Sequence, residues 1–141
     1  MLSKTLEKAI NDQIRDELYS SYLYQSMSAW ASAHNFDGAA SWLSLQAIEE
    51  HEHGMKLYQY MLDRGAAVVL QAIAQPPSEF GSLLGIFEQV QAHEAKVTAL
   101  IHKLYALALQ EDDYATQVAL QWFVTEQVEE EANAAKVVDT L

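Results

Sequence analysis

The stretch from Ser3 to Asn35 contains neither Gly nor Pro and consists mainly of good helix formers. Ser3 can cap the start of a helix, because a serine side-chain oxygen accepts a hydrogen bond from the first free backbone N–H groups. Asp37 and Gly38 follow, and Asp37 offers a second N-cap. We therefore predict a long first helix, a short turn and the start of a second helix.

The remaining Gly, Pro and acidic residues predict three more helices. The second helix should continue to Arg64, since Gly65 can adopt the left-handed conformation that follows many helix ends. Residues 66–81 contain both prolines and are predicted as a long loop. A third helix is expected over about residues 82–110, and a fourth follows the acidic turn at residues 111–113.

The lengths of these elements predict the fold class. Each helix of roughly 28 residues would be about 42 Å long, and a loop of about 16 residues can stretch some 50 Å. The long loop can therefore span the length of a bundle. We predict an all-α, antiparallel four-helix bundle with one long crossover, as a single domain over residues 1–141. A disordered linker between two separate hairpins is less favoured, because each hairpin would expose its apolar face.

Composition restricts the possible functions. Twenty acidic and eight basic residues give a formal net charge of -12, which repels nucleic acids and favours cations. The chain has no Cys, so any metal site must use His and carboxylates. The N-terminus lacks the apolar core of a signal peptide, and no run of 18 apolar residues occurs. A cytoplasmic protein without membrane attachment is expected.

The first helix has apolar residues on two sides. One stripe contains Leu6, Ile10, Ile14 and Tyr24 together with Glu17, and the roughly opposite stripe contains Tyr19, Tyr22, Leu23, Met27 and Trp30. A helix that is apolar on two sides is usually buried on both, which predicts an oligomer. The alternative is one broad core face with a few exposed aromatic side chains.

Polar residues recur at a constant offset of 77 positions. The offset relates Glu17 to Glu94, Glu50 to Gln127 and His53 to Glu130, and also Glu49 to Glu126 and Glu52 to Glu129. Counted from the two short turns, the members of the first three pairs lie at similar depths along the helices. We therefore predict that one layer of the bundle holds Glu17, Glu50, His53, Glu94, Gln127 and Glu130.

This layer has the composition of a metal site. Glu50 and His53 form Glu-x-x-His, which places both side chains on one helix face. Burying several carboxylates without a counter-charge would cost many kcal/mol, so a cation is expected among them. Oxygen-rich ligands with one imidazole suit iron, manganese or zinc. A Glu from each of two helices with Glu-x-x-His from the other two is a di-iron pattern. The alternative is a set of solvated acidic residues on amphipathic helices.

These residues and their spacing resemble the non-haem bacterial ferritins over essentially the whole chain, including the runs at 48–54 (IEEHEHG) and 122–131 (WFVTEQVEEE). The resemblance implies one iron bound by Glu17, Glu50 and His53. It implies a second iron bound by Glu50, Glu94 and Glu130, with Glu50 bridging and Gln127 lining the site. It further implies a third iron site formed by Glu49, Glu126 and Glu129 with Glu130. Tyr24 resembles the tyrosine beside the di-iron centre, although a core tyrosine is the alternative.

The resemblance also implies a function. Ferrous iron would be oxidised by dioxygen or hydrogen peroxide, which makes the protein a ferroxidase, and ferric mineral would be stored in a shell of 24 identical subunits. No haem is implied, because position 52 is Glu and not the Met of bacterioferritins. The sequence departs from the family in having no short fifth helix after the fourth. The competing hypotheses are a di-iron oxidase or peroxidase that retains its metals, and a helical interaction module without catalytic activity.

Overall fold

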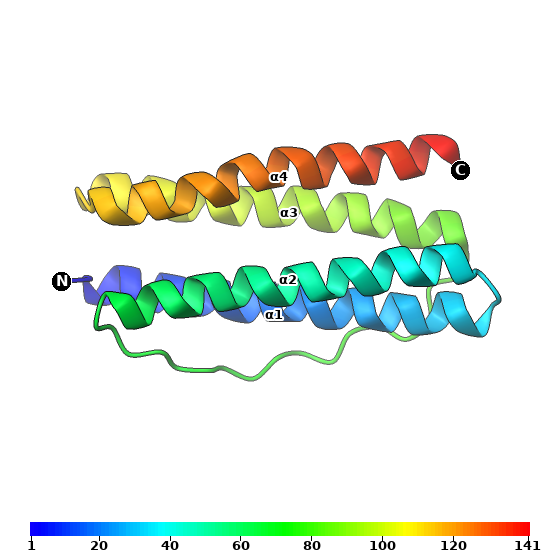
Figure 1. The fold of residues 1–141 in the computed structure, drawn as a ribbon, viewed down its shortest axis with the longest axis horizontal. Coiled ribbons are helices and arrows are strands. Elements are labelled where there is room, and N and C mark those ends of the chain that lie inside the picture. The colour runs from blue at the N-terminus through cyan, green and yellow to red at the C-terminus, as the bar shows by residue number, and fades with distance from the viewer. The chain divides into compact units, whose positions relative to one another are not determined.

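The computed structural model describes all 141 residues and contains four α-helices and no strands (Figure 1). The helices are α1 (Lys4–Ala33), α2 (Asp37–Asp63), α3 (Leu83–Gln110) and α4 (Tyr114–Thr140). The four predicted helices and the long irregular segment after the second helix are thus confirmed. Residues 3–83 and 84–141 form two structural units, each of which contains one helical hairpin.

The first unit begins at the predicted cap. Ser3 Oγ accepts a hydrogen bond of 3.1 Å from the Leu6 backbone N–H. At the turn, Asn35 has a positive φ of 65° and reverses the chain, so that α1 and α2 lie antiparallel and side by side (Figure 1). Asp37 was predicted to cap α2, and this is wrong by one position. The capping residue is Phe36, without a side-chain hydrogen bond, and Asp37 is the first helical residue.

The crossover is attached to α1 by hydrogen bonds. Buried Asn11 donates to the Ala67 carbonyl (3.0 Å) and accepts from the Val69 N–H (2.9 Å). Further along α1, Ser26 Oγ donates to the Pro77 carbonyl at 2.6 Å. The crossover therefore follows α1 from its first third to its last third, and the alternative of a disordered linker is wrong. Gly65, with φ of 67°, takes the predicted left-handed conformation just after α2.

Both apolar stripes of α1 are largely buried. Leu6, Ile10, Ile14 and Tyr24 are buried, as expected. The second stripe is also mostly buried, since only Tyr22, at 53% exposure, lies open, while the buried members are Leu23, Met27 and Trp30. Burial on both sides agrees with the prediction, and Tyr22 is the one exposed aromatic residue of the second stripe. Because this burial already occurs within a single chain, the oligomer stays a prediction.

The second unit consists of α3 and α4. The acidic turn between them forms as predicted: Asp112 has a positive φ of 54°, and Asp113 Oδ1 accepts from the Thr116 backbone N–H at 3.0 Å. Side-chain hydrogen bonds connect the two helices near their middle, where Thr98 contacts Glu131 and Gln127 contacts Glu94. These bonds fix the register of α3 against α4.

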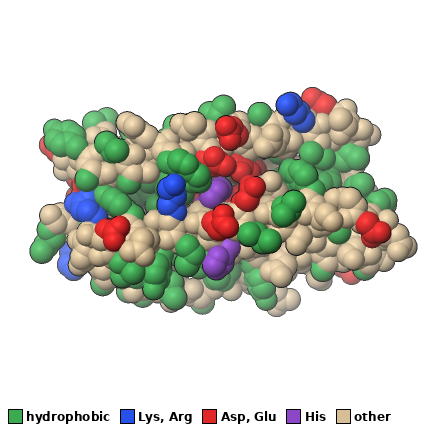
Figure 2. Space-filling view, viewed as in Figure 1, with side chains coloured by type: hydrophobic (Ala, Val, Ile, Leu, Met, Phe, Trp, Pro, Cys, Tyr) green, Lys and Arg blue, Asp and Glu red, His purple; other side chains and the backbone are tan.

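The surface reflects the acidic composition. On the face shown in Figure 2, Asp and Glu side chains are more numerous than Lys and Arg side chains, in keeping with the net charge of -12. None of the four helices contains an apolar stretch long enough to cross a membrane.

Candidate metal centre

Three predicted ligands come together in the first unit. Glu17 on α1 lies with Glu50 and His53 on α2, and each residue offers a ligand atom within 4.8 Å of those of the other two. Their exposed fractions are only 1%, 0% and 5%. The alternative that these are solvent-facing acidic residues is therefore wrong for this group.

The local geometry follows from the sequence. Glu50 and His53 are one turn apart on α2, and His53 Nδ1 lies 3.3 Å from Glu50 Oε2. The next residue is Gly54, where an added Cβ would lie 3.2 Å from Leu18 Cδ2 and 3.6 Å from Glu17 Cβ. The absence of a side chain at position 54 thus lets α1 approach α2 beside the three ligands.

The electrostatics of Glu17 suit the binding of a cation. Glu17 Oε1 accepts a hydrogen bond of 3.2 Å from Gln13 Nε2, whereas Oε2 is buried without a hydrogen-bond partner. Burial, and after it the neighbouring charge of Glu50, raises the pKa of Glu17 well above its usual range. His53 and Gln13 act in the opposite direction but do not offset these effects. A divalent cation would compensate both carboxylates, so the donor set fits one.

The second unit holds the other predicted ligands. Glu94 on α3 and Gln127 and Glu130 on α4 are all buried, with exposures of 1%, 3% and 5%. Gln127 Nε2 donates to Glu94 Oε2 at 3.1 Å. Both hairpins therefore bury one Glu on their first helix and two further polar groups, three residues apart, on their second helix. This matches the offset of 77 positions in the sequence.

Of the remaining predicted site residues, Tyr24 lies in the core and the three glutamates are more exposed than the ligands described above. Tyr24 is fully buried on α1, two turns after Glu17, and its role beside a metal stays a prediction. Glu49 and Glu129 are exposed, and Glu126 is half-buried. Exposed carboxylates commonly occur without a metal, so the third iron site also stays a prediction.

Sequence reasoning missed three polar residues near the ligands. Gln13 lies one turn before Glu17 and donates to it. Thr98 and Glu131 lie one turn after Glu94 and Gln127, and Thr98 Oγ1 donates to Glu131 Oε2 at 2.7 Å. A search one turn on either side of each ligand would have found all of them, because such residues share a helix face with it.

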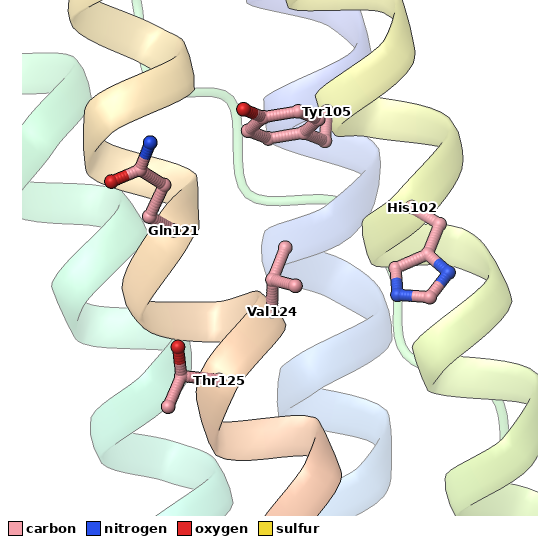
Figure 3. A pocket seen from close by; sticks show the side chains of 5 residues that line it. All are labelled: His102, Tyr105, Gln121, Val124 and Thr125. Atoms are coloured by element: carbon pink, nitrogen blue, oxygen red, sulfur yellow. The ribbon is translucent and has the colours of Figure 1, made fainter.

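A separate pocket of about 410 Å³ opens between α3 and α4 (Figure 3). It is lined by His102 and Tyr105 from α3 and by Gln121, Val124 and Thr125 from α4. No carboxylate lines it, so it lacks the ligand set of an iron site.

Comparisons with known proteins place the chain in a family. Residues 7–141 match the model of the Ferritin-like domain named Ferritin. A bacterial non-heme ferritin of Campylobacter jejuni is 42% identical over 141 residues, which is 100% of this chain and 84% of the relative. A probable bacterial non-heme ferritin-like protein of Haemophilus influenzae is 40% identical over 141 residues, which is all of this chain and 86% of that protein.

Solved structures agree. An open pore ferritin from the archaeon Archaeoglobus fulgidus is similar at a TM-score of 0.98 and 44% identity, covering 99% of this chain and 85% of the other. A structure described as humanized archaeal ferritin gives a TM-score of 0.99 and 43% identity, covering 100% and 86%. The predicted all-α four-helix fold with one long crossover is thus confirmed, and no fifth helix occurs among the 141 residues. The chain belongs to the ferritin family.

Proposed function

We propose that this chain is an iron-storage protein that binds ferrous iron at a di-iron ferroxidase centre, oxidises it and retains the ferric product as mineral. The observation that carries the proposal is the buried group of Glu17, Glu50 and His53, in which one oxygen of Glu17 has no hydrogen-bond partner. Membership of the ferritin family supports iron over manganese or zinc as the ion.

The assignment of ligands follows the predicted layer. Glu17, Glu50 and His53 would bind the first iron, and Glu50, Glu94 and Glu130 the second, with Gln127 beside it. This arrangement requires the two hairpins to form one domain over residues 1–141 in which both sets of ligands face each other at one level. The constant offset of 77 positions and the burial of all six side chains support that requirement.

The donor set suits a substrate ion that enters and leaves. Each ferrous ion gives up one electron, so a pair supplies the two electrons that reduce dioxygen to hydrogen peroxide or peroxide to water. The second half of the layer has Gln127 and Glu130 where the first half has Glu50 and His53. The neutral amide of Gln127, at the position that corresponds to the carboxylate of Glu50, removes one anionic donor there, which favours release of the ferric product.

Two further roles belong to this proposal. Tyr24, buried on the same stripe as Glu17, would donate an electron or a hydrogen bond during oxidation. Glu49, Glu126 and Glu129 with Glu130 would hold a third iron. The net charge of -12 would raise the local concentration of ferrous ions. A homo-oligomeric shell of 24 subunits in the cytoplasm, without haem, nucleic acid or membrane, completes the proposal.

The experiment that tests the proposal is aerobic addition of ferrous iron to wild type, Glu17→Gln and Glu94→Gln, with Glu88→Gln on the exposed side of α3 as a control. We expect both ligand variants to lose oxidation rate by at least about tenfold, and the control to retain it. Particle size and iron per chain should be measured together. Unchanged oxidation in both ligand variants would contradict the ferroxidase, and a fixed two irons per chain without mineral would favour a retained di-iron cofactor.

A further inference from the structure

The amide of Gln127 lies at a branch point of hydrogen bonds between α3 and α4. Its nitrogen, Nε2, lies 3.1 Å from Glu94 Oε2, 3.3 Å from the Glu94 backbone carbonyl and 3.0 Å from Thr98 Oγ1. Nε2 is the donor in all three contacts, two of which must share one of its two hydrogens, and none uses the amide oxygen Oε1. The whole network lies within the second unit.

Thr98 adds a third acceptor for this amide, beside the two oxygens of Glu94. Thr98 Oγ1 lies 2.7 Å from Glu131 Oε2, and Glu131 is half-buried on α4. Thr98 donates its single hydroxyl hydrogen to Glu131. The same oxygen can then only accept from Gln127. The amide must therefore present its nitrogen, since a flipped amide would turn Oε1 toward acceptors only.

We propose that Thr98 and Glu131 are positioning residues that hold the amide of Gln127 in place and, through it, fix the binding mode of Glu94. With Nε2 held on Glu94 Oε2, Glu94 is directed to bind a ferrous ion through Oε1, and Gln127 faces an ion with its carbonyl oxygen. This inference rests on the proposed function, because it assumes that Glu94 is a ligand. It assigns to Gln127 the role of orienting Glu94, in addition to lining the site.

The spacing of these residues along α3 and α4 explains how the hydrogen-bond network forms. Thr98 follows Glu94 by one turn of α3, and Glu131 follows Gln127 by one turn of α4. Each helix thus supplies one inner residue and one residue a turn further along. Partners behind the ligands of metal sites commonly orient those ligands, and their loss typically lowers metal affinity about 10- to 100-fold. A charged acceptor at Glu131 strengthens the chain of bonds, because hydrogen bonds to an ionised group are the stronger kind.

The test is titration with cobaltous ion, whose visible absorption reports the coordination of each bound ion. The variants are Thr98→Val, which removes the hydroxyl at nearly constant shape, and Thr98→Ser, which restores it. Thr125→Val is the matched control, since Thr125 is exposed on α4 and outside the network. Glu131→Gln keeps an oxygen that can accept from Thr98 and should have a smaller effect than Thr98→Val.

We expect wild type, Thr98→Ser and Thr125→Val to bind two cobaltous ions per chain with the same spectrum. Thr98→Val should retain the tighter ion and bind the other about tenfold or more weakly, with an altered spectrum. The inference would be overturned by Thr98→Val binding both ions like wild type. It would also be overturned by Thr98→Ser behaving like Thr98→Val, or by Thr98→Val losing both ions together with its thermal stability. Wild type that binds no cobaltous ion would instead contradict the proposed function.

Discussion

Gly54 approaches Leu18 so closely that a Cβ at position 54 would lie 3.2 Å from Leu18 Cδ2. Alanine would gain about 1 kcal/mol of helix propensity over glycine, which offsets a displacement of the flexible Leu18 end. We expect Gly54→Ala to keep the free energy of unfolding within about 1 kcal/mol. Gly54→Val should lower it by about 1–3 kcal/mol through overpacking and separate Glu17 from its partners on α2. Urea denaturation measures the change in the free energy of unfolding, and cobalt binding measures the displacement of Glu17 from its partners.

The control for these variants is Gly38→Ala near the start of α2. Nothing lies within 4 Å of a Cβ at position 38, so this change should be neutral or stabilising. A Gly54→Val protein as stable as Gly38→Ala would show that the close approach does not constrain the hairpin.

Removing the buried charge of Glu17 should raise the stability of the metal-free protein and abolish its oxidation of ferrous iron. The pKa of Glu17 is raised, first by burial and then by Glu50, so its ionised form destabilises the metal-free protein. We expect metal-free Glu17→Gln to be more stable than wild type at pH 7 by about 1 kcal/mol or more, while losing ferrous oxidation. Thermal unfolding with and without a chelator gives the comparison. Equal stability of the two metal-free proteins would mean that Glu17 carries no uncompensated charge.

Divalent ions should stabilise the wild type. An ion that binds only the folded chain adds about 2.7 kcal/mol at a hundred times its dissociation constant. Ferrous ion added without oxygen, or zinc, should therefore raise the melting temperature, and a chelator should reverse this. His53→Ala should show a smaller rise, since it removes the only imidazole of the group. An identical rise in the variant would place the stabilising ion elsewhere.

Asn11 should be important for holding the crossover. Asn11→Ala removes one donor and one acceptor and leaves the Ala67 carbonyl and the Val69 N–H unpaired. A loss of about 1–3 kcal/mol is expected, together with faster proteolysis within residues 66–81. Ser26→Ala, which removes an exposed bond to Pro77, should cost less and serves as the comparison. Equal protease resistance of both variants and wild type would contradict the anchoring role of Asn11.

The pKa of Asp12 predicts how the stability of the protein changes in acid. Burial alone would raise the pKa of Asp12, but hydrogen bonds from Gln71 and Lys8 and the charges of Lys8 and Arg15 together lower it below its usual value. A lowered folded-state pKa contributes stability that is present above the unfolded value and lost as pH falls through the folded value. Stability should therefore decline below about pH 4. Asp12→Asn should reduce the free energy of unfolding that is lost on acidification by less than about 1 kcal/mol, measured by urea unfolding at several pH values.

The sequence correctly predicted most features that lie within a single helix or at its ends. The cap at Ser3, the left-handed Gly65, the acidic turn at residues 111–113 and the shared face of Glu50 and His53 follow from local rules. The error at Asp37 arose because Phe36 takes up the capping position, one residue earlier than the side-chain pattern indicated.

Depth along the helices correctly predicted that Glu17 meets Glu50 and His53, but other features that depend on two helices escaped prediction. Periodicity shows that Leu23, Met27 and Trp30 share a stripe, but it does not show what covers them. The bond between Thr98 and Glu131 joins residues 33 positions apart, so no local pattern contains it. The direction of the Gln127 amide likewise depends on a partner on the facing helix.

The crossover also has a practical consequence for protein engineering. Asn11 recognises the crossover through backbone atoms of Ala67 and Val69, and Ser26 does the same at Pro77, so these anchors place no demand on side chains. Residues 72–75 lie exposed between them. A foreign peptide inserted there would leave every anchor in place and cost little more than the entropy of a longer loop, about 0.6 kcal/mol for each doubling. The segment is a natural point for displaying an added sequence on this ferritin.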